Sequence, residues 1–274
     1  MKMEDIIQLD ILIAEQETRD ILIAILSDHR YYAFQESDKK LHAFIPQIDF
    51  DEGELREIFK NYSFAYSFSL VKKRNWNALW ESEFEPVYLN DFLTIRAHFH
   101  PPSLTVQHDI IITPKMSFGT AHHPTTYLML EAMRNIDFSE KVVMDFGTGT
   151  GILAILAEKL GAKSVLAIDN DEWSIQNAKE NIIVNKCKRI EVLKSDSPAG
   201  SVKYDIILSN INLNVILDNV NALVLSGVHG TKLILSGFME PDLEIMESTF
   251  SKFHSGIEHS RMKDSWLCLQ LCLD

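Results

Sequence analysis

"VVMDFGTGTGILAI", residues 142–155, is an apolar run that ends in an acid and is followed by three glycines in five positions. The apolar run predicts a buried strand, and the apolar residues after the glycines predict a helix. Glycines between a strand and a helix permit a tight turn and let the backbone approach a ligand closely. This unit predicts an α/β fold whose ligand site lies at the carboxyl edge of a parallel sheet.

The chain downstream of this unit alternates between helical and strand patterns. Near-continuous apolar strands are expected at SVLAIDN, RIEVLKSD, YDIILSNI and TKLILSGF, with helices between them. Such alternation predicts a Rossmann-like, doubly wound and mostly parallel sheet. The final stretch, GIEHSRMKDSWLCLQLCL, has two strand patterns and no helix between them, so one antiparallel strand is expected near the end.

The N-terminal part has a different pattern, β-α-β-β-α-β, which predicts a small α+β ferredoxin-like domain. Thr18 is the expected N-cap of its first helix. We expect this domain at residues 1–74, a linker with connecting strands at 75–115, and the larger domain at 116–274. Trp76 and Trp80 fall in the linker, where they could pack between domains or form a platform for a substrate.

Composition limits the possible partners. Acidic residues outnumber basic ones 39 to 26, for a formal charge of −13. Because nucleic-acid-binding proteins normally present a basic face, direct nucleic-acid binding is not expected, and a cationic protein is the better partner. Three cysteines without framework spacing favour a reducing compartment. The chain has no signal-peptide pattern and no membrane-spanning run, so we expect a soluble, cytoplasmic protein.

The acids around the glycines discriminate among candidate ligands. The spacing is G-x-G-x-G, with Gly147 and Gly149 in the loop, whereas a dinucleotide fingerprint reads G-x-G-x-x-G. Asp145 would repel a pyrophosphate but suits a ligand with an ammonium group. Asp169, at the end of the next strand, can accept hydrogen bonds from a ribose diol. S-adenosylmethionine, which has these groups and no phosphate, is therefore favoured over a nicotinamide dinucleotide.

Other polar residues follow the next two strands. Asp196 could accept from an adenine amine or serve only as a turn acid. Asn210 could face the methionine end of the ligand or the amine that is methylated. Upstream, His122 and His123 precede a helix that Pro124 and the following threonines are expected to start. Adjacent histidines without further ligand spacing predict no metal site, but His123 could position or exchange a proton.

The combined motifs resemble a known family. "FGTAHHPTT" (118–126), "DFGTGTG" (145–151), "AIDND" (167–171) and "SNIN" (209–212) are similar to the ribosomal protein methyltransferases that modify protein eleven of the large ribosomal subunit. "NWNALWESEFEP" (75–86) and the N-terminal domain extend the resemblance over nearly the whole chain. The family consists of S-adenosylmethionine-dependent protein-lysine methyltransferases that trimethylate amino groups and hold the substrate with the N-terminal domain.

The resemblance implies particular contacts with the cofactor. They fall on Thr126, Gly147, Asp169 and Asn210, while Phe118 and Gly119 match the loop that covers it. Two positions depart from the family's usual FGTGTHPTT, since Ala121 replaces a glycine and His122 replaces a threonine. These two departures put in doubt whether the loop that contains Phe118 and Gly119 is as flexible as it is in the family.

Methyl transfer to lysine requires a neutral amine, although lysine has an ordinary pKa of about 10.4. No general base is evident, so we expect positioning by Asn210 and a nearby carbonyl to dominate, with His123 as a helper. Three alternatives remain: methylation of another protein or of a nucleic-acid amino group, a nicotinamide oxidoreductase, and a non-catalytic module that binds the cofactor. The first usually carries an N-P-P-Y type sequence where this chain has SNIN.

Overall fold

A computed structural model describes most of the chain, as two compact units. The described residues are 5–13, 15–37, 40–60, 64–71, 84–113, 118–198, 202–253 and 255–274. The N-terminal unit is Met1–Trp80 and the C-terminal unit is Glu81–Asp274. Trp76 and Trp80, for which packing or substrate contact was considered, lie outside the described residues.

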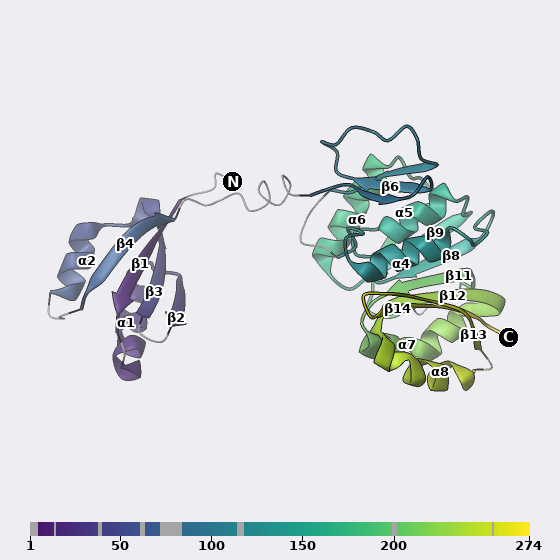
Figure 1. Ribbon diagram of the computed structural model, residues 1–274. Helices are drawn as coiled ribbons and strands as arrows, with labels where there is room; N and C mark the ends of the chain where they lie inside the picture. The colour runs from purple at the N-terminus through teal and green to yellow at the C-terminus, as the bar shows by residue number, and fades with distance from the viewer. Residues whose placement is uncertain are drawn as a thin grey trace. The chain divides into compact units, whose positions relative to one another are not determined.

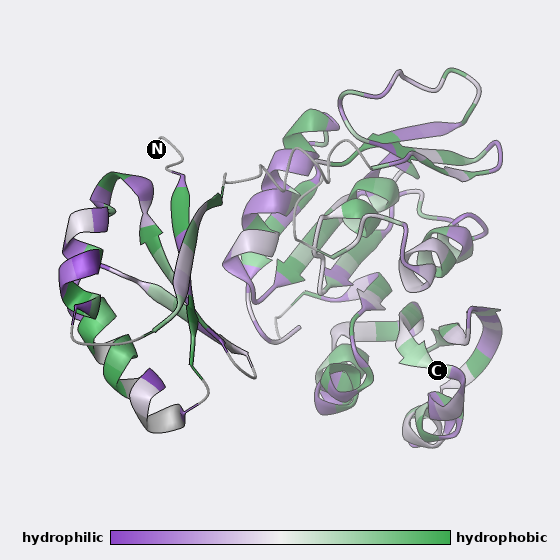
Figure 2. Cartoon of the chain, turned by 60° about the vertical axis from the view of Figure 1, so that its left-hand side comes forward, coloured by the Kyte–Doolittle hydropathy of each residue, from purple (hydrophilic) through white to green (hydrophobic). Residues whose placement is uncertain are grey.

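The N-terminal unit has the β-α-β-β-α-β order expected from its pattern. Its four strands pair in the order β2-β3-β1-β4, all antiparallel. Alternate residues of β1, including Leu9 and Ile11, are fully buried against the two helices. The helix ribbons change between green and purple along their length, as amphipathic helices do (Figure 2). The elements are β1 (Ile6–Leu12), α1 (Gln16–Asp28), β2 (Ala33–Ser37), β3 (Lys40–Pro46), α2 (Glu52–Phe59) and β4 (Tyr66–Val71).

The first helix begins earlier than expected. Its N-cap is Glu15, and Thr18 lies inside the first turn. The Thr18 hydroxyl donates to Glu15 Oε2 at 3.0 Å instead of capping a backbone N–H. The second helix follows the usual rule, because the Asp51 side chain accepts from the N–H groups of Gly53 and Glu54.

The C-terminal unit is built on a seven-stranded sheet in the order β10-β9-β8-β11-β12-β14-β13 (Figure 1). Pairs from β10 to β12 are parallel, whereas β14 runs antiparallel to both of its neighbours. The expected mostly parallel sheet with one antiparallel strand near the end is therefore confirmed. The strands are β8 (Val142–Phe146), β9 (Ser164–Asp169), β10 (Ile190–Lys194), β11 (Tyr204–Asn210), β12 (Gly227–Met239), β13 (Gly256–Lys263) and β14 (Trp266–Cys272).

Helices cover both faces of this sheet. On one face α4, α5 and a small three-stranded sheet form one apolar core, and on the other face α7 and α8 form a second (Figure 1). The helices are α4 (Pro124–Met133), α5 (Ile152–Lys159), α6 (Glu172–Val184), α7 (Leu213–Ser226) and α8 (Leu243–Ser251). The small sheet consists of β5 (Val87–Leu89), β6 (Leu93–Arg96) and β7 (His108–Ile111). No helix in the described part of the chain has the length and apolarity needed to cross a bilayer.

Candidate active site

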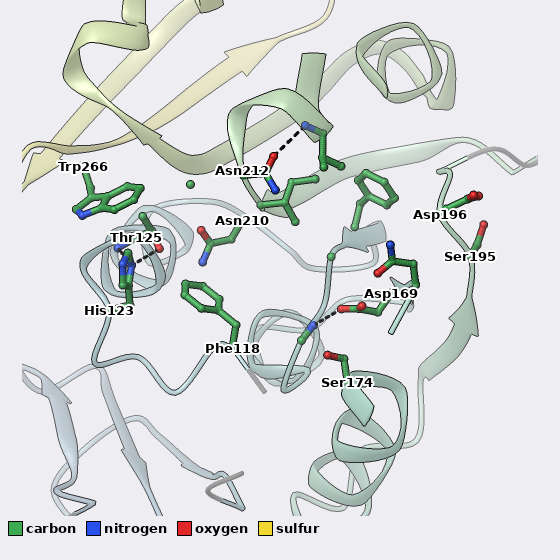
Figure 3. A pocket seen from close by; sticks show the side chains of 17 residues that line it. Phe118, His123, Thr125, Asp169, Ser174, Ser195, Asp196, Asn210, Asn212 and Trp266 are labelled. Atoms are coloured by element: carbon green, nitrogen blue, oxygen red, sulfur yellow. Dashed lines mark hydrogen bonds between the residues drawn. The ribbon is translucent and has the colours of Figure 1, made fainter. Parts of the chain in front are cut away.

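A cavity of about 480 Å³ lies where strands of the large sheet reach their carboxyl ends. This is the edge at which open α/β folds bind ligands, and the volume suits a ligand of nucleoside size. Figure 3 shows polar side chains on one side of the cavity and rings with an amide on the other. We call these the acidic end (Asp169, Asn170, Ser174, Ser195 and Asp196) and the aromatic end (Phe118, His123, Asn210 and Trp266).

The glycine loop forms the floor between the two ends. Gly147 and Gly149 line the cavity, and both have positive φ, +81° and +55°. The N–H groups of Gly147 and Thr148 donate to the carbonyl of Ile168, which ties the loop to the end of β9. A Cβ at Gly149 would lie 2.4 Å from the Phe118 carbonyl oxygen. Only glycine can therefore let the loop and the segment from Phe118 approach this closely.

Asp169 is the best-positioned carboxylate of the acidic end. Its Oδ2 accepts from Gly149 N at 2.9 Å, and its Oδ1 accepts from Asp171 N at 3.0 Å. Each carboxylate oxygen has two lone pairs, so both oxygens can still accept from a ribose diol. Asp196 lies in the same end, but its side chain is exposed after the end of β10.

Three rings from two separate segments meet at the aromatic end. The ring of His123 lies between Phe118, with centroids 5.2 Å apart, and Trp266, with centroids 4.8 Å apart. His123 is also the N-cap of α4, because its Nδ1 accepts from Thr125 N at 3.3 Å. Pro124 and the threonines form the first turn of this helix, as expected, and the structure adds His123 as its cap.

The hydrogen bond to Nδ1 limits what His123 can do. When Nδ1 accepts, the proton of a neutral imidazole is on Nε2. Burial lowers the pKa of His123 below its ordinary value, which favours this neutral form. His123 can thus present an N–H donor and an aromatic face to the cavity, but Nε2 has no free lone pair with which to accept a proton.

Asn210, at the end of β11, has an unused acceptor. Its Nδ2 donates to Thr126 Oγ1 at 3.2 Å, while its buried Oδ1 has no partner among the described residues. Buried polar atoms are nearly always paired, so this oxygen marks a position for a ligand donor. Thr126 itself is fully buried and is not among the residues that line the cavity, so its expected contact with the cofactor stays a prediction. Its hydroxyl orients the Asn210 amide.

Two other expected contacts also lie behind the wall. Asp145 is fully buried, and its Oδ2 accepts from Thr148 Oγ1 at 2.6 Å and from Ala154 N at 3.2 Å. Burial raises its pKa to about 7. Gly119 is buried as well, and its carbonyl accepts from Thr150 Oγ1 at 2.5 Å. Both residues support the glycine loop from behind. The sequence did not reveal this, because strand spacing indicates the face of the sheet on which a residue lies and not how deeply its side chain is buried.

Several residues that line the cavity were not predicted from the sequence, and Trp266 and Gly237 are two of them. Trp266 follows a turn in which Asp264 and Ser265 both have positive φ, and it reaches the cavity from the start of β14. Gly237 interrupts the pairing of β12 with β14 at a bulge, where a Cβ would lie 2.0 Å from the Ile211 carbonyl oxygen. A glycine inside a strand pattern indicates such a close approach, so this signal was available.

Comparison with known protein sequences identifies the family of this chain. The model of the family described as ribosomal protein L11 methyltransferase (PrmA) matches residues 8–273. The chain belongs to this family. A relative from Porphyromonas gingivalis, named ribosomal protein L11 methyltransferase, is 36% identical over 263 residues, which cover 93% of this chain and 91% of the relative. One with the same name from Chlorobaculum parvum is 37% identical, with 92% of each chain covered.

A solved member of the L11 methyltransferase family has the same fold. The ribosomal protein L11 methylase from Lactobacillus delbrueckii subsp. bulgaricus superimposes with a TM-score of 0.65 at 30% identity, covering 70% of this chain and 100% of that chain. The expected resemblance, the methyltransferase fold and S-adenosylmethionine as the methyl donor are thereby confirmed. The cavity fits this cofactor, since it offers free carboxylate lone pairs at one end, a glycine floor, and an unpaired amide oxygen at the other.

Proposed function

We propose that this enzyme transfers methyl groups from S-adenosylmethionine to lysine amino groups of ribosomal protein L11, up to the trimethyl stage. The unpaired Oδ1 of Asn210 is the main support, because it offers a buried acceptor for an amine N–H at the aromatic end. The names of the relatives supply the identity of the substrate protein. Ribosomal proteins are made in the cytoplasm, so the proposal places the enzyme there.

The acidic end and the glycine loop would hold the nucleoside half of the cofactor. Asp169 would accept from the ribose diol, and Asp196 from the exocyclic amine of adenine. Gly147 and Gly149 would let the backbone pass close to the ligand, with Phe118 and Gly119 in the segment above it. When bound, the cofactor supplies a methyl group activated by the positive sulfur to which it is attached.

The aromatic end would prepare the substrate amine. Rings of Phe118, His123 and Trp266 would displace part of the water around the amine, and this partial desolvation lowers the pKa of a lysine so that its neutral form is accessible. In the first two transfers Asn210 Oδ1 would accept an N–H of the neutral amine and so direct the nitrogen lone pair toward the methyl carbon. The dimethylated amine has no N–H, so in the third transfer the rings alone would position it. Because His123 is held neutral and donates through Nε2, we assign it positioning, not base catalysis. The proton from the amine would leave to water.

Repeated transfer also suits this end of the cavity. Each added methyl group makes the ammonium larger and less hydrated, and aromatic faces attract such cations by about 1–2 kcal/mol. Residues 1–74 would hold the substrate protein, residues 75–115 would form the linker and connecting strands, and residues 116–274 would perform the transfer. The acidic balance of residues 1–90, with 17 acids and 10 bases, favours a cationic partner.

The deciding experiment is the intact mass of purified ribosomal protein L11 after incubation with this enzyme and S-adenosylmethionine. Mass gains in whole methyl steps are expected, and peptide mapping would place them on lysine side chains. Gains on other residues would overturn the lysine assignment. Cofactor binding without any mass gain would overturn the proposed substrate and favour another basic protein or a non-catalytic module.

A further inference from the structure

The segment with which the described part of the C-terminal unit begins is held against the loop beside the cavity. Phe84 is only 4% exposed, and its ring meets the ring of His122 edge-on, with centroids 4.8 Å apart at 75°. On its other side Phe84 stacks with His100, with centroids 6.2 Å apart at 26°. Phe84 therefore lies between a residue of the 118–123 loop and a residue that follows β6.

His122 also makes a polar connection to this segment. Its Nε2 lies 3.0 Å from the carbonyl oxygen of Glu85, and its Nδ1 lies 3.2 Å from the hydroxyl of Thr120. A carbonyl can only accept, so Nε2 is the donor in the first bond. The Thr120 hydroxyl can donate to Nδ1 and so hold the ring in this tautomer. One side chain thus fixes the 84–85 segment by a hydrogen bond and by a ring contact.

The same loop is bound to the glycine loop at its other end. Thr150 N donates to the Phe118 carbonyl at 3.0 Å, and the Thr150 hydroxyl donates to the Gly119 carbonyl. Contacts therefore run from Glu85 through His122 and the 118–123 loop to the floor of the cavity. Ala121, in the middle of this loop, is 2% exposed and has a φ of +68°. A non-glycine residue in this conformation stays there only when its surroundings determine it.

His100, another ring in contact with Phe84, is hydrogen-bonded to an ion pair. Arg96 donates to both carboxylate oxygens of Asp109 at 2.7–3.0 Å, and its Nη1 donates to the His100 carbonyl at 2.9 Å. This nearly buried ion pair fixes His100, against which Phe84 stacks. A change at His122 would therefore release the 84–85 segment from the loop but leave its other support in place.

We propose that His122 is a positioning residue that ties the segment entering the C-terminal unit to the loop beside the cofactor cavity. In the sequence this segment follows the N-terminal unit, which ends at Trp80. The inference rests on the proposed function, because only an enzyme whose N-terminal unit holds the substrate needs this segment at a fixed position relative to the cavity. His122 thus acts on the delivery of a large substrate and not on the transferred methyl group.

Kinetics provide the first test, with His122→Ala, His122→Gln and His259→Ala compared with the wild-type protein. His259 is exposed on β13 and serves as the matched control. For His122→Ala we expect the KM for ribosomal protein L11 to rise about two- to tenfold, the factor that one hydrogen bond is typically worth. The kcat and the KM for a short lysine peptide should not change. His122→Gln, which keeps an N–H donor, should restore most of the lost affinity.

Hydrogen exchange provides a second test that does not depend on turnover. S-adenosylhomocysteine should slow amide exchange in residues 118–123 and also at Phe84, Glu85 and Val87 of the wild-type protein. In His122→Ala the slowing should persist at 118–123 and disappear at the other three amides. The inference would be overturned if His122→Ala lost activity equally with the peptide and the protein substrate. It would also be overturned if S-adenosylhomocysteine still slowed exchange at Phe84, Glu85 and Val87 in this variant. Failure of the wild-type protein to methylate L11 would instead overturn the proposed function.

Discussion

The two ends of the cavity are built in different ways. Most of the acidic end comes from the turns after β9 and β10, and Asp169 is oriented by two backbone N–H groups. The aromatic end takes one residue each from β11 and β14 and two from the segment before α4 (Figure 3). At the acidic end the polar groups are already partly paired, whereas at the aromatic end Asn210 Oδ1 has no partner within the described parts of the chain. This difference suggests binding at one end and chemistry at the other.

The floor that joins the two ends should be the most sensitive position. Gly149→Ala would place a Cβ 2.4 Å from the Phe118 carbonyl at a positive φ. Relief would require movement of backbone, at a cost of about 3 kcal/mol or more. Calorimetry should show at least a hundredfold loss of cofactor affinity. Gly256→Ala, with nothing within 4 Å of the added carbon, is the matched control and should bind normally. Near-normal binding by Gly149→Ala would contradict the close approach.

Asn210→Ala tests whether chemistry is confined to the aromatic end. Removal of the amide should lower kcat about a hundredfold, as is typical for loss of a group that positions a reacting centre. The dissociation constant of the cofactor should change little, since Asp169 and the glycine loop remain. Single-turnover kinetics with L11 and equilibrium binding separate the two effects. Similar losses of cofactor binding and of turnover would contradict the proposal that the acidic end binds the cofactor and the aromatic end performs the chemistry.

Asp169→Ala is the converse change at the acidic end. It removes acceptors for the ribose diol and leaves Gly149 N and Asp171 N without their partner. Affinity for the cofactor should fall about 10- to 100-fold, because hydrogen bonds to a charged group are worth about 1.5–3 kcal/mol. The kcat at saturating cofactor should stay close to normal. Asp196→Ala provides the comparison, and because that carboxylate is exposed its loss should matter much less.

Behind the floor, Asp145 predicts a smaller, pH-dependent effect on stability. Burial raises its pKa to about 7 in the folded protein, from an ordinary value of 3.8. The folded state therefore binds a proton that the unfolded state releases, so this contribution to stability is present at acidic pH and lost as the pH rises through 7. Between pH 6 and pH 8 the cofactor-free protein should lose about 1 kcal/mol of unfolding free energy relative to Asp145→Asn. Urea titrations of both proteins measure this difference, and identical pH profiles would contradict it.

Sequence reasoning was most successful where function depends on residues close together in the chain. The glycine loop, Asp169 and Asn210 were identified because each ends a predicted strand of a parallel sheet, and such ends meet at one edge. The antiparallel strand near the end was identified from the lack of a helix before it. Local patterns of this kind determine which residues reach the edge.

The burial of individual side chains, and contacts between distant parts of the chain, were harder to predict from the sequence. Thr126 and Asp145 are spaced as ligand contacts, yet both are buried behind the wall, since packing between layers decides which polar group faces the cavity. Trp266 was missed because its position depends on β14 entering the sheet between β12 and β13. The start of α4 at Pro124 was predicted, but its cap was not, because a histidine, His123, takes the place that serine, threonine, aspartate or asparagine usually occupies.

The position of β14 has a consequence for biosynthesis. Strand β14 follows every other strand along the chain, yet it lies inside the sheet and contributes to both apolar cores through Cys268 on one face and Leu269 on the other. While the chain grows from its N-terminus, β12 has an open edge, β13 has no partner, and the cavity lacks Trp266. A nascent chain is therefore both prone to aggregation and incomplete as an enzyme until β14 has emerged. Loss of this strand from a mature molecule would expose the same edge of β12 and remove Trp266 from the cavity.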